Sequence, residues 1–169
     1  SPLLLPRDSA NAGLEGVAED GDPAGYVEGD DAVAGATVFD TPVGADAPGP
    51  IGPGGAYEFT LQALPGDKLG FVTMFVPSND WFYTPTDEDN SISLFEDDVP
   101  LSGDVTGQIA LWDAGTEQDE VPGEGPNQVQ RQGAANTGPA EGGSVGSLAA
   151  QGKSVELNGS VIEVTITSR

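Results

Sequence analysis

The sequence contains neither cysteine nor histidine, and only 5 of its 169 residues are lysine or arginine. Without these residues there is no disulfide bond and no Cys/His zinc site. Catalysis by Ser-His-Asp or Cys-His arrangements is excluded as well, because both need an imidazole as the base. No apolar run approaches the ~20 residues of a membrane-spanning helix, so we expect no insertion into a membrane.

Acidic residues dominate the charge: Asp and Glu number 28, and the formal net charge is −23. Such a polyanion is repelled by phosphate backbones and by anionic membranes, so nucleic acid is not an expected partner. At molar salt the Debye length falls to roughly 3 Å, and most of the self-repulsion is screened. The composition therefore resembles that of proteins from extreme halophiles. The alternative is an ordinary acidic protein.

Short apolar runs predict an all-β fold in a single domain that covers residues 1–169. In Ala56–Leu64 apolar and polar residues alternate, as in a half-buried strand, and Leu69–Val76 is apolar throughout, as in a central strand. Further short strands are expected at Gly35–Asp40, Ser91–Phe95, Gln108–Trp112, Ser154–Leu157 and Ser160–Ser168. Many short strands with Gly/Pro-rich connections favour an antiparallel β-sandwich.

Outside the strands, we expect one short helix at Ser9–Asp20, capped by Ser9 or Asn11 and ended by Gly21. About forty residues, Asp113–Lys153, have no periodic pattern, which indicates either a functional loop or disorder. Within this stretch Gly142–Gly146 matches G-x-S-x-G, but without a histidine or a preceding strand it predicts only a glycine-rich turn.

The two ends of the chain carry their own signals. Asn158-Gly159 predicts a type I′ hairpin turn. With Ser160 it also forms an N-glycosylation sequon, which matters if the protein is exported. The chain starts at Ser1 without a basic and apolar leader, so we expect a processed or trimmed chain.

Two predicted turns place carboxylates where strands stop, each beside a tryptophan: Pro77–Phe82 contains Asp80, and Trp112–Glu117 contains Asp113 and Glu117. If the turns meet at one end of the sandwich, the three carboxylates would repel one another unless a cation lay between them. A cage of oxygen ligands suits Ca²⁺. The alternative is two unrelated surface turns in a protein rich in acids.

Several longer stretches share a pattern with one known family: Phe59–Leu69 (FTLQALPGDKL), Thr73–Phe82 (TMFVPSNDWF), Leu101–Thr106 (LSGDVT), Leu111–Glu117 (LWDAGTE), Gly123–Gln132 (GEGPNQVQRQ) and Asn136–Gly138. Between residues 59 and 138 the chain resembles the spondin N-terminal domain, the F-spondin-type module, in a secreted halophilic archaeal or bacterial version. The resemblance implies a C2-like antiparallel β-sandwich that holds one Ca²⁺ at an edge through Asp80, Asp113 and Glu117. Animal members usually have Asp at the position of Glu117.

Arg131 also fits the family pattern, and we expect it to pin the long loop through a bidentate carboxylate pair. Calcium would then fasten the same loop to the sandwich. These expectations describe a non-catalytic module, secreted or displayed on the cell surface, that serves adhesion or extracellular structure by binding an extracellular protein or glycan.

Two alternatives stay open. The chain could be the subunit of an extracellular filament, a homo-oligomer in which Ser1–Pro6 adds a strand to a neighbour. It could also be a carboxylate-based glycan hydrolase, although no histidine or cleft signature favours an enzyme.

Overall fold

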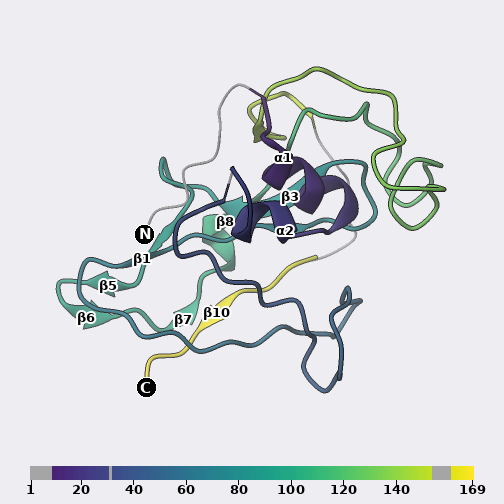
Figure 1. Cartoon of the computed structure of the whole chain (residues 1–169). Helices are drawn as coiled ribbons and strands as arrows, with labels where there is room; N and C mark the ends of the chain where they lie inside the picture. The colour runs from purple at the N-terminus through teal and green to yellow at the C-terminus, as the bar shows by residue number, and fades with distance from the viewer. Residues whose placement is uncertain (1–8, 31, 154–160) are drawn as a thin grey trace.

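The structure, a computed structural model, describes residues 9–30, 32–153 and 161–169. These residues are rich in short antiparallel strands and contain little helix (Figure 1). The helical segments are α1 (Ala12–Glu15), the π-helix η1 (Gly16–Asp20), α2 (Ala24–Val27) and the 3-10 turn η2 (Thr106–Gln108). The strands are β1 (Lys68–Leu69), β2 (Thr73–Met74), β3 (Trp81–Pro85), β4 (Ile92–Ser93), β5 (Phe95–Glu96), β6 (Val99–Pro100), β7 (Gly103–Asp104), β8 (Ile109–Asp113), β9 (Gly146–Ser147) and β10 (Thr165–Ile166). No helix in the described part of the chain has the length and apolar character needed to traverse a bilayer.

The N-terminal helix follows the expectation closely. Asn11 caps it, because its side-chain oxygen accepts a hydrogen bond from the backbone N–H of Leu14 at 2.9 Å. The chain leaves the helical conformation at Gly21, whose φ of +69° lies in the left-handed region that glycine enters freely. Leu14 and Val17 are buried, as their shared face predicts.

The main sheet has four strands in the order β2-β3-β8-β9, all antiparallel. Its centre is the β3–β8 pair, in which Trp81 lies opposite Asp113 and Phe82 opposite Trp112. The expected strand at Gln108–Trp112 is thus confirmed as β8. The expected central strand at Leu69–Val76 is divided: Leu69 ends β1, and Thr73–Met74 form β2 at the edge of the main sheet. The central place belongs to β3, which is buried along its whole length.

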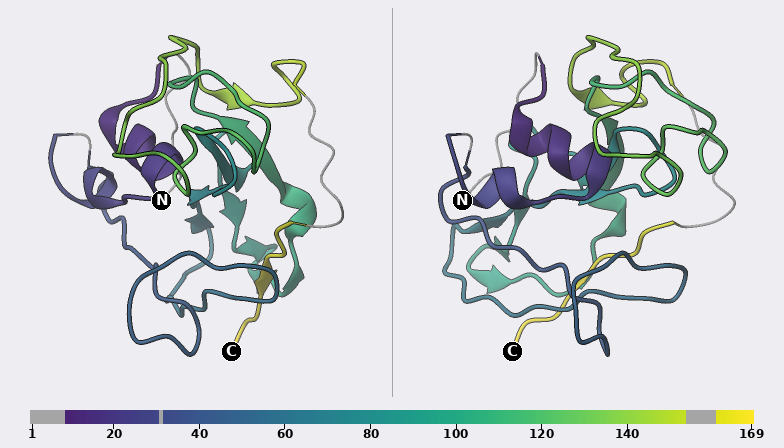
Figure 2. Two further views of the ribbon diagram at one scale, coloured as in Figure 1. Left: turned by 90° about the vertical axis from the view of Figure 1, so that its right-hand side faces the viewer. Right: turned by 45° about the vertical axis from the view of Figure 1, so that its right-hand side comes forward.

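Hydrophobic residues pack on both faces of the β3–β8 pair. On one face Phe82 and Trp112 pack beneath α1 and η1, which lie across that side of the sheet (Figure 2). This cluster consists of Leu14, Ala18, Phe82, Trp112, Ala114 and Val145. The other face carries a second cluster of Phe75, Trp81, Tyr83 and Leu148. The sheet therefore has a helical layer on one side and loop and strand residues on the other.

Two expected strands are wrong. Neither Gly35–Asp40 nor Ala56–Leu64 forms a strand in the described part of the chain, and Gly35 lies in a turn. The alternation places Phe39 and Phe59 side by side instead, with ring centroids 4.3 Å apart and both rings partly exposed. Period-2 alternation selects one face of a segment, but a strand also needs a neighbouring ladder for its N–H and C=O groups.

The remaining strand predictions are met only in part. Ser91–Phe95 is divided between β4 and β5, which pair with β1 and β6 respectively. In the described part of Ser160–Ser168, residues 161–168, the strand is β10, which pairs with β7. The predicted segments Ser1–Pro6 and Ser154–Leu157 and the turn at Asn158-Gly159 lie outside the described residues.

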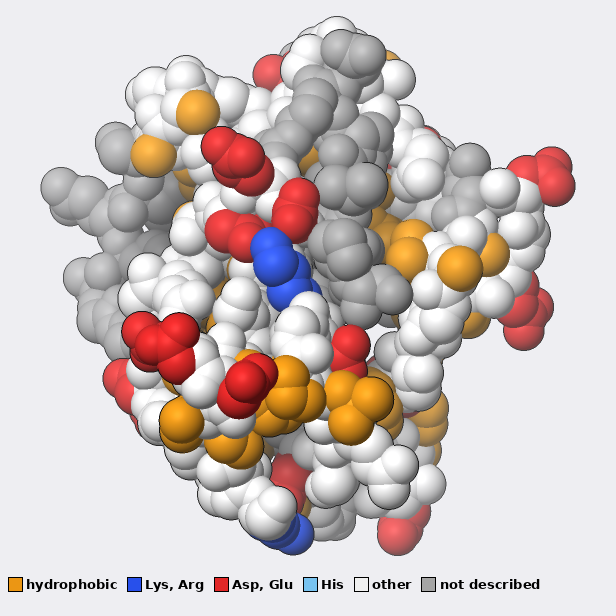
Figure 3. All heavy atoms as spheres, turned by 90° about the vertical axis from the view of Figure 1, so that its left-hand side faces the viewer, with side chains coloured by type: hydrophobic (Ala, Val, Ile, Leu, Met, Phe, Trp, Pro, Cys, Tyr) orange, Lys and Arg blue, Asp and Glu red, His pale blue; other side chains and the backbone are white. Residues whose placement is uncertain are grey.

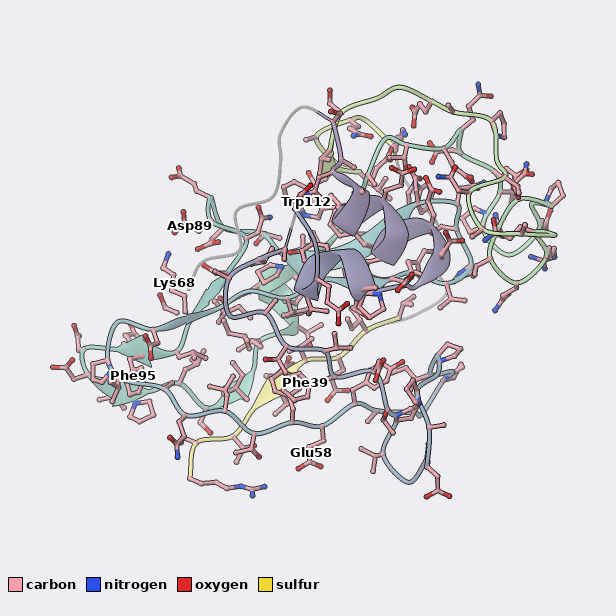
Figure 4. The ribbon with its side chains drawn as sticks, in the orientation of Figure 1. Phe39, Glu58, Lys68, Asp89, Phe95 and Trp112 are labelled. Carbon is pink, nitrogen blue, oxygen red and sulfur yellow. The ribbon has the colours of Figure 1, made fainter. Side chains whose placement is uncertain are left out.

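On the face of the molecule shown in Figure 3, acidic side chains lie in scattered positions with few basic groups between them. Lys68 of β1 points toward Asp89 (Figure 4), and its ammonium lies 2.8 Å from Asp89 Oδ2 and 3.5 Å from Asp87 Oδ2. This surface ion pair shares no residue with the candidate metal centre described below. Substitutions of Lys68 therefore serve as a control for changes of charge elsewhere in the chain.

The long segment 114–152 folds back over the N-terminal helix. The amide of Gln132 donates to Asp20 at 2.6 Å, and that of Asn136 donates to Glu15 at 2.8 Å. Arg131 was expected to bind a carboxylate. Instead it donates to the carbonyl oxygen of Gly123 and to the side chain of Gln128, so it pins the loop to its own backbone.

Candidate metal centre

The register of the central sheet brings the two predicted carboxylate turns together. Asp80 directly precedes β3, and Asp113 ends β8, whose last residue pairs with the first residue of β3. The backbone N–H of Ala114 donates to the carbonyl of Asp80 at 3.1 Å and closes this end of the pair. Both carboxylates are fully buried. The two turns therefore meet, which is the condition that the predicted site required.

A third carboxylate joins them from the long loop. Asp80, Asp113 and Glu141 each offer an oxygen, and these atoms lie within 4.8 Å of one another, an arrangement that could hold a metal ion. The backbone N–H of Glu141 donates to the carbonyl of Thr116 at 2.8 Å, which places Glu141 beside the end of β8. Asp80 and Asp113 are buried and Glu141 is exposed, so the cluster reaches from the interior to the surface.

The Asp80 carboxylate is held firmly through one oxygen. Its Oδ2 accepts from the backbone N–H of Thr116 at 2.7 Å, from that of Glu117 at 3.1 Å, and from the Thr116 hydroxyl at 3.1 Å. Its Oδ1 is buried, and no donor among the described residues reaches it. An oriented carboxylate with one buried, unsatisfied oxygen has capacity left for a cation.

The environment of Asp80 opposes its ionisation in the absence of a cation. Burial raises the pKa of Asp80 above its ordinary value of 3.8, and the negative charge of Asp113 raises it further. The hydrogen bonds from Glu117 and Thr116 lower this pKa but do not cancel the increase. A divalent ion beside the two carboxylates would reverse the effect of both causes.

Asp113 is oriented by a turn that only glycine can make. Asp113 Oδ1 accepts from the backbone N–H of Gly115 at 2.6 Å. Gly115 has φ +70°, and a Cβ atom there would lie 2.7 Å from the backbone carbon of Gly143. The turn and the close approach of the two chain segments therefore both require glycine at this position.

Glu117, predicted as a ligand, lies close by but outside the three-residue cluster. It is buried, and its Oε1 accepts from the backbone N–H of Gly138 at 2.7 Å. Its Oε2 accepts from the amide of Asn79 at 3.3 Å. In this arrangement Glu117 fastens the long loop to the turn before β3.

The positively charged side chain of Lys153 contacts the cluster. The Lys153 ammonium bonds Asp113 Oδ2, lies 2.6 Å from Asp119 Oδ2, and lies 3.6 Å from Glu141 Oε1. Burial lowers the pKa of Lys153, but hydrogen bonds to Asp113 and Asp119 outweigh it, so the pKa is raised and the group is charged. Asp119 also accepts from Trp81 Nε1 at 2.6 Å, which fixes its orientation.

A further buried carboxyl group lies under the long loop. Glu19 of η1 is 3% exposed, and its Oε2 has no donor among the described residues. Burial raises the pKa of Glu19 to about 7, although a hydrogen bond with the Thr116 side chain lowers it. The nearby charges of Glu117 and Asp80 add to the increase.

The glycine-rich segment shapes the access to the cluster. A pocket of about 380 Å³ is lined by Asp113, Gly115, Glu141, Gly143, Ser144, Gln151 and Lys153. The predicted glycine-rich turn around Ser144 therefore forms one wall of this pocket. Asp113 borders this pocket, although its side chain is itself buried.

The sequence patterns identified Asp80 and Asp113 but missed Glu141, Asp119 and Lys153. These three residues lie in the aperiodic segment, where no spacing rule connects them to a strand end. The one available signal was composition: Lys153 is one of only five basic residues, and a buried acidic cluster has few other sources of compensating charge.

No family model, curated protein or solved structure gives a significant match to this chain. The resemblance to the spondin N-terminal domain therefore depends on the sequence stretches quoted above.

Proposed function

We propose that the chain is a non-catalytic, calcium-binding module, secreted or displayed on the cell surface, that acts in adhesion or extracellular structure at high salt. We further propose that its strands belong to a C2-like β-sandwich of the spondin type. Its partner would be an extracellular protein or glycan, with nucleic acid disfavoured by the net charge of −23.

The observation that carries the proposal is the geometry of Asp80. Its carboxylate is fully buried and oriented through Oδ2, yet Oδ1 lacks a donor among the described residues. Two further carboxylates, Asp113 and Glu141, bring oxygen atoms to within 4.8 Å. A buried negative charge needs a compensating charge, and a bound cation is the direct way to supply it.

Calcium suits this site better than other common metals. All side-chain ligands are carboxylate oxygens, and the chain has no Cys or His to favour zinc or copper. Calcium accepts six to eight oxygen ligands at roughly 2.3–2.6 Å in flexible geometry, so water and backbone carbonyls can complete the shell. Magnesium requires a stricter octahedron and holds its water more tightly.

Calcium would act here by stabilising the loop face. Asp80 directly precedes β3 and Asp113 ends β8, whereas Glu141 belongs to the long loop. One ion would therefore join the central sheet to the loop. An ion that binds only the folded chain adds RT ln(1 + [L]/Kd), about 2.7 kcal/mol at a hundredfold excess over Kd. For a chain of this size that corresponds to about 5–10 °C in Tm. The rigid loop face would then be available to a partner.

The test is a calorimetric titration of Ca²⁺ in molar salt, with thermal melting in calcium and in chelator. We expect wild type to bind one ion, and Asp80→Asn and Glu141→Gln to weaken binding about tenfold or more, because ligand charge sets affinity. Glu58→Gln is the matched control, since the Glu58 side chain is 70% exposed and its ion pair in the described part of the chain is a long one, with Arg169 at 3.8 Å. A wild-type chain without calcium binding would refute the proposal.

Glu117→Gln belongs in the same series because it distinguishes the ligand set predicted from the sequence, which contains Glu117, from the cluster in the structure, which contains Glu141. If Glu117 only fastens the loop, this variant loses less affinity than Glu141→Gln. If it loses more, Glu117 is a ligand, as the sequence predicts. The filament and glycan-hydrolase alternatives gain no supporting observation from the described residues.

A further inference from the structure

We infer that Lys153 occupies the cation position of the candidate metal centre, and that a divalent ion enters by displacing its ammonium group. This inference rests on the proposed function and concerns the regulation of the same site. Lys153 would act as a tethered counter-ion that holds the cluster together when no metal is bound.

The ammonium shares two of its carboxylate partners with the candidate metal centre. It bonds Asp113 Oδ2 and lies 3.6 Å from Glu141 Oε1, so it touches two of the three carboxylates of the cluster. The other oxygen of Asp113 already accepts from Gly115. Lys153 therefore binds the Asp113 oxygen that has no backbone donor.

The two cations cannot share the site. Carboxylate oxygens that lie within 4.8 Å of one another leave room between them for one ion at the usual Ca–O distances of roughly 2.3–2.6 Å. An ammonium left on the same Asp113 and Glu141 oxygens would be only a few Å from that ion. Repulsion between them in a buried setting is strong, so metal binding and the Lys153 contacts exclude each other.

The surroundings allow the side chain to leave without unfolding the chain. The backbone N–H of Lys153 donates to the carbonyl of Leu148 at 2.9 Å, which anchors the residue next to β9. Its side chain is 26% exposed and lines the pocket of about 380 Å³. A flexible lysine stem can therefore swing its charged end into solvent while the backbone stays in place.

The consequence is a chain that stays folded without calcium and binds calcium with reduced affinity. When the competent state is only fractionally populated, the apparent Kd rises by the inverse of that fraction. If the ammonium occupies the cluster nine times in ten, apparent affinity falls about tenfold. Removing the ammonium would restore the affinity and would make the stability of the fold depend on calcium.

The first experiment follows the displacement in the unmodified chain. The sequence has two lysines, Lys68 and Lys153, so acylation by a water-soluble succinimidyl ester can be quantified for each by peptide mass spectrometry. We expect saturating Ca²⁺ to accelerate acylation of Lys153 several-fold and to leave Lys68 unchanged. Calcium binding with an unchanged Lys153 rate would overturn the inference and leave the proposed function standing.

The second experiment compares Lys153→Met with Lys68→Met by calcium titration. Methionine keeps the apolar stem and offers no ligand for calcium. We expect Lys153→Met to bind calcium about tenfold more tightly than wild type, and Lys68→Met to bind as wild type. Equal tightening in both variants would indicate net charge alone and overturn the inference. If Lys153→Met does not fold even in calcium, the acylation experiment decides.

The outcomes separate this inference from the proposed function. If neither wild type nor Lys153→Met binds calcium, the proposed function fails and the inference fails with it. If only Lys153→Met binds, Lys153 blocks the site in the native chain, which supports the competition and refutes calcium binding as the native function.

Discussion

Replacing Glu19 by Gln should change how the stability of the metal-free chain depends on pH. Glu19 is 3% exposed in η1, and burial raises its pKa from 4.5 to about 7. Between these two values the folded chain keeps a proton that the unfolded chain has lost. The free energy of unfolding therefore falls as pH rises through this window.

The magnitude follows from the shift. A rise of about 2.5 pKa units, at 1.36 kcal/mol per unit, corresponds to about 3 kcal/mol of stability lost between pH 4.5 and pH 8. Asp80 acts in the same direction, because burial and Asp113 raise its pKa as well. Wild type should thus be more stable in chelator at pH 5 than at pH 8, and Glu19→Gln should remove the part of this slope that Glu19 contributes.

The assay is chemical denaturation in chelator at a series of pH values between 5 and 8. The slope of stability against pH is the informative quantity, since the amide also changes the hydrogen bond with Thr116. Glu58→Gln serves as the exposed control and should keep the wild-type slope. The reasoning is refuted if Glu19→Gln and wild type show the same slope, or if wild type becomes more stable toward pH 8.

Two further predictions concern the turn and the loop that hold the site. Gly115→Ala should lower the free energy of unfolding by about 1–3 kcal/mol and weaken calcium binding, because φ is +70° and the added Cβ would meet the Gly143 backbone. Thermal melting measures the change in stability and calorimetry the change in calcium affinity. An unchanged Tm would contradict this prediction. Arg131→Ala should speed proteolytic cleavage between residues 121 and 131 several-fold, because the variant loses the hydrogen bond from the guanidinium to the Gly123 carbonyl. Cleavage at the wild-type rate would show that this hydrogen bond does not order the loop.

The parts of the site that the sequence predicts are those encoded by local signals. Asp80 and Asp113 each stand where an apolar strand meets a turn, and tryptophan marks both junctions. Because strands pair antiparallel with Trp81 opposite Asp113, the two acids must lie at the same end of the sheet. Local pattern and simple topology suffice for this half of the site.

The rest depends on long-range backbone hydrogen bonds that no local pattern encodes. Glu141 reaches the cluster because its N–H binds the carbonyl of Thr116, and Gly143 binds Gly115 at 2.7 Å. Lys153 is placed by its bond to Leu148. The segment that carries Glu141 and Lys153 lacks periodicity, so its path over the sheet is visible only in three dimensions.

The predicted strand at Ala56–Leu64, which the structure does not contain, shows a case in which a clear local pattern misleads. Its alternation is regular, yet the segment finds no ladder within the described residues, and Phe59 stacks on Phe39 at the surface. Alternation reports which side chains share a face. It does not report whether another strand is present to form hydrogen bonds with the backbone N–H and C=O groups.

Sensitised terbium luminescence offers the most direct view of a cation at this site. Tb³⁺ takes oxygen ligands much as Ca²⁺ does, and Trp81 lies opposite Asp113 in the sheet, close enough to transfer excitation to an ion held there. We expect tryptophan excitation to produce terbium emission that calcium competes away and that Asp80→Asn abolishes. Absence of emission, or emission of equal strength in Asp80→Asn, would contradict a metal centre between Asp80, Asp113 and Glu141.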